Sequence, residues 1–147
     1  NLKEAQEELK NRHLIPIKIK ESKNRFSFSL FTKSQNIENF YSADGLVSDF
    51  ITCIDTDNSG NIWIGTNNGV SFFDGTSFTN YNDSDGIIDK NILSVKCGLN
   101  NEVYVGTNFG LSVYYGSNWL SYDILSGLSD NKIVNIDIKK KFFIVSI

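Results

Sequence analysis

The stretch IWIGT at residues 62–66 returns as VYVGT at residues 103–107, an offset of 41 positions. Working outward, residues 45–81 align with residues 86–122 without a gap, and residues 127–147 align with the first half of the same unit. The aligned positions of matching chemical type are Gly45, Gly86 and Gly127; Ile51, Ile92 and Ile133; Ile54, Val95 and Ile136; Gly69 and Gly110; Ser71 and Ser112; Gly75 and Gly116; Phe78 and Trp119; Tyr81 and Tyr122. Self-similarity at a fixed period indicates a repeat architecture.

Each complete unit predicts four short β-strands separated by turns. In the first unit the strands are expected at residues 50–55, 62–66, 70–73 and 77–81. Apolar residues alternate along these strands and glycines interrupt them, which excludes an α-helix from the unit. A four-stranded unit of about 41 residues is the size of a β-propeller blade. The sequence therefore predicts an all-β fold built from propeller-type blades of four antiparallel strands.

Small and large residues within the unit predict how neighbouring blades pack. Gly65 and Gly106 lie near the ends of the second strands, where the missing side chain permits close approach of another backbone. Cys53 and Cys97 fit best as small buried apolar residues, because two cysteines do not make a disulfide framework. The aromatic residues expected to fill the wedge between blades are Trp63, Phe72, Phe73, Phe78, Tyr104, Tyr114 and Trp119.

The chain divides into a lead and a blade segment. Residues 1–20 are expected to hold a short helix over residues 1–14 and a linker strand after it. The remaining residues, 21–147, are expected to form the propeller segment. Its parts are a half blade at residues 26–41, complete blades at 45–81 and 86–122, and a half blade at 127–147.

The predicted blades do not close into a ring. The two half blades would supply the outer and inner strands of one blade, giving three blades per chain, whereas closed propellers have about four to eight. An open arc leaves apolar sheet faces in water. We therefore expect either homo-oligomerisation or further blades of the same, longer chain.

Composition and charge limit the classes of function. The 147 residues carry a net charge of -3 and are 40% hydrophobic, which fits a globular chain. Residues 34–131 hold two lysines and twelve acidic residues, a charge of -10 that would repel nucleic acid. No apolar run approaches the ~18 residues of a membrane span, and no leader is visible.

Catalytic and metal-binding chemistry is not expected from these residues. The single histidine, His13, lies in the lead, so no Ser-His-Asp or Cys-His arrangement can form in the blades. Residues 55–60 imitate the first half of a calcium loop, but its twelfth position is Thr66 and not a bidentate Glu. A hairpin turn is the better interpretation. We predict no enzyme activity, no catalytic residue, no metal and no cofactor.

One rim of the blades holds the candidates for ligand binding. In an antiparallel sheet, the turn between the second and third strands lies at the same end as the connection into the first strand. Amides and carboxylates there can bind hydroxyl groups, and Phe109 can stack on a sugar face. Turn formation is the alternative role of Asn67, whereas a turn gains little from Phe109. The candidates are Ser48, Asp49, Asn67, Asn68, Asp89, Lys90, Asn108 and Phe109.

The repeat resembles that of two-component regulator propellers. The resemblance covers residues 45–122, and the copy at 86–122 is looser because Asn101 stands where the first copy has Gly60. It implies a non-catalytic sensory or ligand-binding segment of a two-component signalling system, periplasmic or extracellular, with an oligosaccharide as the ligand class. The alternatives are a repeat scaffold that binds protein and self-associates, and a propeller lyase or hydrolase, which lacks its histidine and paired acids.

Overall fold

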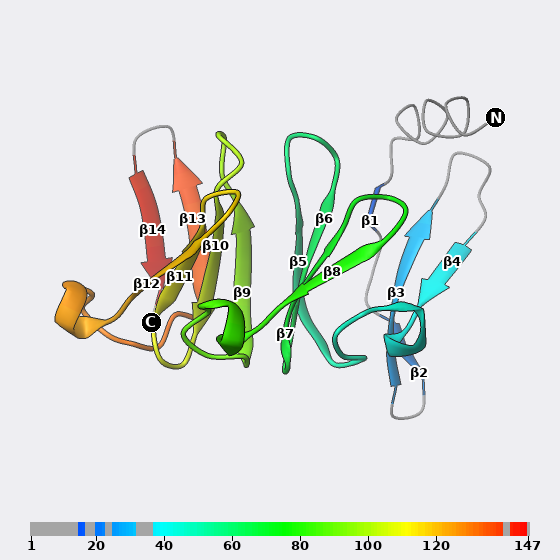
Figure 1. Ribbon diagram of the computed structural model, residues 1–147, viewed down its shortest axis with the longest axis horizontal. Coiled ribbons are helices and arrows are strands. Elements are labelled where there is room, and N and C mark those ends of the chain that lie inside the picture. The colour runs from blue at the N-terminus through cyan, green and yellow to red at the C-terminus, as the bar shows by residue number, and fades with distance from the viewer. Residues whose placement is uncertain (1–14, 17–19, 23–24, 32–36, 140–141, 147) are drawn as a thin grey trace.

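The structure is a computed structural model that describes residues 15–16, 20–22, 25–31, 37–139 and 142–146. Within these residues four antiparallel sheets follow one another along the chain (Figure 1). The helices in this part of the chain are three one-turn 3-10 helices, so the predicted all-β fold is confirmed. The helix expected at residues 1–14 lies outside the described residues, and so does His13.

The first complete sheet is paired in the order β5-β6-β7-β8. Every strand boundary lies within one residue of its predicted position. Strand β6 is buried along its whole length, which explains why its sequence is an apolar run between two polar turns. The strands are β5 (Ile51–Thr56), β6 (Ile62–Thr66), β7 (Gly69–Phe73) and β8 (Phe78–Tyr81).

The second complete sheet repeats this order and its irregularity. The register between first and second strands shifts at the same place in both sheets, after Ile51 opposite Thr66 and after Ile92 opposite Thr107. A bulge conserved between the two copies bends both first strands alike. The strands are β9 (Ile92–Cys97), β10 (Val103–Thr107), β11 (Leu111–Tyr114) and β12 (Trp119–Tyr122).

Incomplete sheets flank the two complete ones. At the carboxyl-terminal side, β13 (Asn135–Lys139) pairs with β14 (Phe142–Ser146), as expected for two inner strands. At the amino-terminal side, β3 (Arg25–Phe31) pairs with β4 (Ile37–Phe40). Strands β1 (Ile15–Pro16) and β2 (Lys20–Ser22) also pair with β3. This unit therefore holds more than the expected hairpin, and the division of the chain at residue 20 stays a prediction.

Each connection between sheets carries a one-turn 3-10 helix that ends at a glycine. These turns are η1 (Ser42–Asp44), η2 (Asp83–Asp85) and η3 (Ile124–Ser126). The glycine after each one has a φ of 112°, 109° and 105°, the left-handed region that favours glycine. Repetition of Gly45, Gly86 and Gly127 in the sequence follows from this geometry. The connections at residues 41–50 and 82–91 have the same length, so the two complete copies align without a gap.

Glycine also sets the distance between neighbouring sheets. A side-chain carbon at Gly65 would lie 2.7 Å from Ile92 Cγ2 of the next sheet and would overlap with Cys53 Sγ. At Gly106 such a carbon would lie 2.5 Å from the carbonyl oxygen of Ile133, which leads into β13. The predicted close approaches are therefore present between the sheets β5–β8 and β9–β12, and between the sheet β9–β12 and the pair β13–β14.

Aromatic side chains fill the space between the two complete sheets, β5–β8 and β9–β12. Trp63 is 4% exposed and stacks on Tyr81, with ring centroids 5.9 Å apart and planes at 16°. It also contacts Phe72 of its own sheet and Tyr114 of the next. Tyr114 in turn packs on Trp119 at 5.0 Å. Because these rings come from both sheets, they form one continuous core.

The aromatic packing repeats at the preceding interface. Phe40, Phe73 and Phe78 contact one another at centroid distances of 4.7 to 5.6 Å. These residues stand 41 positions before Tyr81, Tyr114 and Trp119, which form the same three contacts. The fold thus repeats its interfaces as well as its sheets.

Candidate ligand-binding rim

Threonine hydroxyls hold the two turns that carry the candidate residues. In the β6–β7 turn, Thr66 Oγ1 donates to the carbonyl oxygen of Gly69 at 2.8 Å and accepts from the amide of Asn68 at 3.0 Å. Thr107 makes the equivalent bonds to Gly110 and Phe109, each at 3.0 Å. Both threonines are fully buried. The turns are therefore fixed from within, which leaves the two tip side chains free to vary.

A serine relay anchors each connection to the sheet beneath it. Ser71 Oγ accepts from the amide of Val47 at 2.9 Å and donates to Asn80 Oδ1 at 2.6 Å. The Asn80 amide then donates to the carbonyl oxygen of Gly45 at 2.9 Å. In the second sheet Ser112 and Ser121 make the equivalent contacts, to the amide of Ile88 and the carbonyl oxygen of Gly86.

Sequence analysis did not assign a role to these serines. The signal was present, because Ser71 and Ser112 align in the repeat although a buried β-strand position favours an apolar residue. Both are fully buried and hydrogen-bonded, as buried polar groups are expected to be. They position the rim from beneath and are not exposed at its surface.

The structure brings two of the candidate residues of the first blade into direct contact. Ser48 Oγ donates to Asn67 Oδ1 at 2.7 Å, across 19 residues of sequence. The connection and the β6–β7 turn therefore lie at one rim, as the strand order requires. Asp49 accepts from the amide of Ser42 at 2.6 Å and from its hydroxyl at 3.2 Å. Asn68 lies exposed at the turn tip.

The second blade presents its candidate residues differently. Asp89 accepts one hydrogen bond, from the amide of Asn91 at 3.3 Å. Lys90 and Asn108 are exposed, and Phe109 shows 61% of its surface to solvent. A side-chain carbon at Gly110 would lie 3.0 Å from Ile88 Cδ1, so the turn lies directly against the connection here too.

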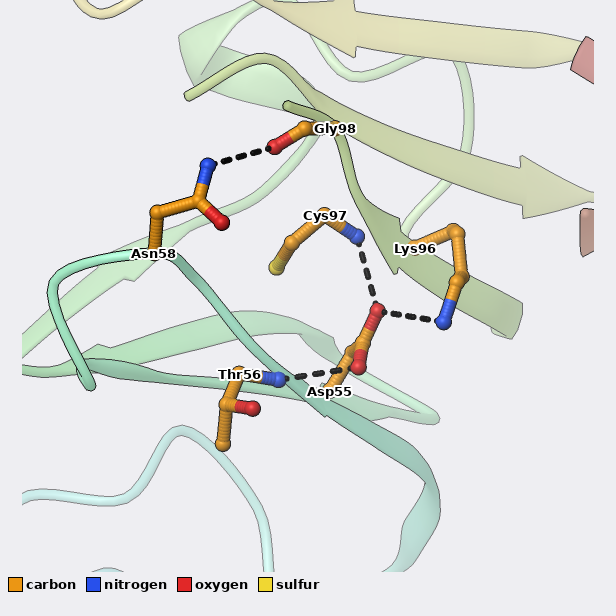
Figure 2. A network of polar contacts seen from close by, with 6 residues as sticks. All are labelled: Asp55, Thr56, Asn58, Lys96, Cys97 and Gly98. Carbon is orange, nitrogen blue, oxygen red and sulfur yellow. Dashed lines mark hydrogen bonds and ion pairs between the residues drawn. The ribbon is translucent and has the colours of Figure 1, made fainter. Parts of the chain in front are cut away.

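The opposite rim carries a polar contact between the two complete sheets. Asp55, near the end of β5, forms an ion pair with Lys96 Nζ at 3.1 Å and accepts from the amide of Cys97 at 2.9 Å (Figure 2). Its second oxygen accepts from the amide of Thr56 at 3.0 Å. The Asn58 amide reaches the carbonyl oxygen of Leu99 at 2.7 Å. These bonds link the two sheets where the inner strands end.

The acidic residues at positions 55–60, which resemble half of a calcium loop, make hydrogen bonds within the β5–β6 turn and to the next sheet. Asp57 Oδ1 accepts from the amides of Ser59 and Asn61 at 2.9 and 3.0 Å. Asp55 faces the next sheet instead. Across the part of the chain that the structure describes, no three His, Cys, Asp or Glu side chains come together as a metal site. The carboxylates here shape a hairpin.

The two cysteines are free thiols that pack against the core between the sheets. Burial raises the pKa of the Cys53 thiol to about 11. Burial, together with the nearby Asp55 and Asp57 carboxylates, also raises the pKa of Cys97. Neither thiol is therefore activated as a nucleophile near neutral pH.

Four-stranded sheets that recur every 41 residues and pack face to face define the class of protein: this chain forms blades of a β-propeller. Among the described helices, none has the length and apolar character needed to cross a membrane.

Residues 45–68 match the family described as two component regulator propeller, so the predicted resemblance is confirmed and the chain carries this repeat. No curated protein sequence matches the chain.

Two solved structures from B. thetaiotaomicron share the fold. Both are described as extracellular domains of hybrid two component systems. The BT3049 domain has a TM-score of 0.68 at 20% identity, over 90% of this chain and 20% of that chain. The BT4673 domain has a TM-score of 0.60 at 20% identity, over 87% of this chain and 20% of that chain. This chain therefore spans a fifth of the length of each, and at this identity the likeness is one of fold.

Proposed function

We propose that this chain is a sensory propeller segment of a two-component signalling protein, and that it lies outside the cytoplasm. The observation that carries the proposal is the two-component regulator propeller repeat at residues 45–68, which contains strands β5 and β6 of a complete four-stranded sheet. The extracellular domains of the two structural neighbours support the same placement. Fold alone does not assign a function, so the proposal depends on the repeat and on the chemistry of the rim.

The rim is the part of the segment best suited to receive a signal molecule. Its turns are rigid, because buried threonine hydroxyls fix them, while their tips differ between blades. Loops on a rigid scaffold are the usual carriers of binding residues. Hydroxyl, amide, carboxylate and aromatic groups meet here, and we propose an oligosaccharide as the ligand class. The segment has no catalytic role in this proposal.

Location is tested by surface labelling of cells that produce the full-length protein. A membrane-impermeant amine reagent should modify Lys90 and Lys132, which are both exposed, in intact cells. Labelling of these lysines only after lysis would contradict the extracytoplasmic placement.

Sensing is tested by thermal unfolding of the 147-residue chain in the presence of neutral and acidic oligosaccharides. A ligand that binds the folded state raises the melting temperature as its concentration rises. We expect at least one oligosaccharide to do so. A melting temperature that no member of the panel changes would contradict carbohydrate binding.

A second candidate function, a self-associating repeat scaffold, is favoured by one observation. Leu120 of β12 and Tyr115, which directly follows β11, are both about half exposed. Apolar surface of this kind promotes association of copies or docking of further blades. Sedimentation measurements at several protein concentrations separate the two functions: a concentration-dependent oligomer without any carbohydrate effect would favour the scaffold.

A further inference from the structure

We propose that the second blade, through Phe109, Asn108 and Lys90, makes the ligand contact at this rim, and that the matching positions of the first blade are structural. The inference rests on the proposed function, because it locates the ligand of that same rim. It comes from a difference between two copies of one backbone arrangement. The copies act as internal controls for each other.

Three of the four candidate side chains of the first blade, those of Ser48, Asp49 and Asn67, are engaged in hydrogen bonds within the protein. Asn67 Oδ1 accepts the hydroxyl of Ser48, and that hydroxyl in turn accepts from the amide of Phe50 at 3.1 Å. Both oxygens of Asp49 accept from Ser42. A ligand would have to compete with these bonds, which lowers the gain from binding.

The equivalent side chains of the second blade keep only one of these bonds, because Asp89 accepts from the amide of Asn91 as Ser48 accepts from that of Phe50. Asp89 replaces Ser48, Lys90 replaces Asp49, and no hydrogen bond joins Asp89 to Asn108 in the described residues. Within the same residues, the side chains of Lys90 and Asn108 have no hydrogen-bond or ion-pair partner. One carboxylate oxygen of Asp89 also remains open. Donors and acceptors are therefore available here without first breaking an internal contact.

These free groups lie close together. Ser48 and Asn67 touch in the first blade, and Asp89 and Asn108 occupy the same positions of the repeat. The closeness of Gly110 to Ile88 shows directly that the turn and the connection meet in the second blade. Phe109 stands beside them with 61% of its surface exposed, whereas the first blade has Asn68 at this position.

The chemistry of this group selects a class of ligand. The Phe109 face packs on an apolar ring face, the Asn108 amide can both donate to and accept from a hydroxyl group, and the Asp89 carboxylate can accept from another. The charges of Asp89 and Lys90 cancel, so no net charge on the ligand is required. A neutral pyranose, with C–H groups on its face and hydroxyls around its edge, combines these features. The ligand is therefore a neutral oligosaccharide.

The test measures the affinity of the 147-residue chain for neutral gluco-, manno-, galacto- and xylo-oligosaccharides by titration calorimetry. Phe109→Ala and Asn108→Ala should each weaken the binding of the best sugar by about tenfold or more. Asn67→Ala and Asn68→Ala should change it by less than about twofold. Leu99→Ala is the matched control for Phe109→Ala, because Leu99 is 67% exposed but lies in the β9–β10 turn at the opposite rim.

The outcomes separate this inference from the proposed function. Sugar binding that survives Phe109→Ala and Asn108→Ala but is lost in Asn67→Ala would overturn the inference and leave the function standing. Binding by none of the neutral sugars, together with binding of an acidic one, would overturn the ligand class and leave carbohydrate sensing in place. If no sugar of either kind bound, both the inference and the proposed sensing of carbohydrate would be overturned. A spectrum of the variants in the far ultraviolet verifies that each one is folded.

Discussion

The two complete sheets, β5–β8 and β9–β12, share a backbone and differ chiefly at their rims. Thr66 and Thr107 hold their turns alike, and Ser71 and Ser112 anchor the connections alike. Side chains at the turn tips and strand ends differ, as between Asn68 and Phe109. The comparison separates the residues that build a blade, which repeat, from those that give one blade its own contacts.

Among substitutions that add atoms, the largest expected effect comes from the glycines that face the next sheet. Gly106→Ala places a methyl group 2.5 Å from the carbonyl oxygen of Ile133, which is backbone, whereas Gly65→Ala meets the ends of the Ile92 and Cys53 side chains. We expect Gly106→Ala to lower the free energy of unfolding by about 3 kcal/mol and Gly65→Ala by about 1 to 2 kcal/mol.

Chemical denaturation measures the glycine series. Gly60→Ala is its control, because nothing lies within 4 Å of that position and its φ of 83° adds only a cost of about 1 kcal/mol. A cost for Gly106→Ala no larger than that for Gly60→Ala would show that the sheets do not approach as closely as the structure has them.

Among substitutions that remove atoms, the largest expected effect concerns one of the two tryptophans. Trp63 packs among three other rings and its indole nitrogen donates to Asp57 Oδ2 at 3.4 Å. Trp63→Ala should cost about 3 to 5 kcal/mol, mainly from the cavity left in the core. Thermal or denaturant unfolding measures it.

Trp119→Phe should cost little by comparison. Trp119 is 8% exposed, and its indole nitrogen has no hydrogen-bond partner among the described residues. A buried donor without a partner costs about 1 to 3 kcal/mol, so losing it offsets the lost ring area. Phe78 already occupies this position in the first blade. A loss as large as that of Trp63→Ala would contradict the comparison.

Removing the serine relay should affect both blades to the same extent. Ser71→Ala and Ser112→Ala each leave a connection amide, that of Val47 or Ile88, without its acceptor. We expect each to lower the free energy of unfolding by about 1 to 3 kcal/mol. Thr79→Ala, an exposed change in the same sheet as Ser71, should stay within about 0.5 kcal/mol. Unequal effects of the two serines would mean that only one connection is anchored.

The smallest expected effect is that of the ion pair between the sheets. Asp55→Asn removes the charge that faces Lys96 but keeps an acceptor for the amide of Cys97. Because Lys96 is partly exposed, the expected loss is below about 1 kcal/mol, and it should shrink further at high salt. Asp55→Ala loses the acceptor as well and should cost more. Equal losses for the two variants would assign the whole effect to the charge.

Much of the fold was predictable because its signals are local or periodic. Alternating apolar residues and turn glycines predict the strands, and the offset of 41 residues predicts that one blade follows another. Gly65 and Gly106 were recognised as points of close approach for the same reason. The pairing of β1 and β2 with β3 was not predicted, because residues 15–22 have no counterpart of known pairing in the repeat.

The site was predictable only in part. Strand order predicts that Ser48 and Asn67 share a rim, but which side chains bond one another depends on rotamers that a sequence does not specify. The Asp55 to Lys96 contact was missed, although opposite charges at equivalent repeat positions were a visible signal. To predict contacts between neighbouring blades, one must know the angle between the blades as well as their order.

That angle follows from the uneven thickness of the layer between the sheets. The layer is thin at Gly65, where the next sheet touches the backbone, and thick where Tyr81 meets Tyr114 and Trp119. A tapered layer sets consecutive sheets at an angle to one another. The angle between consecutive sheets thus depends on the size of a few side chains, from Gly65 to Trp119.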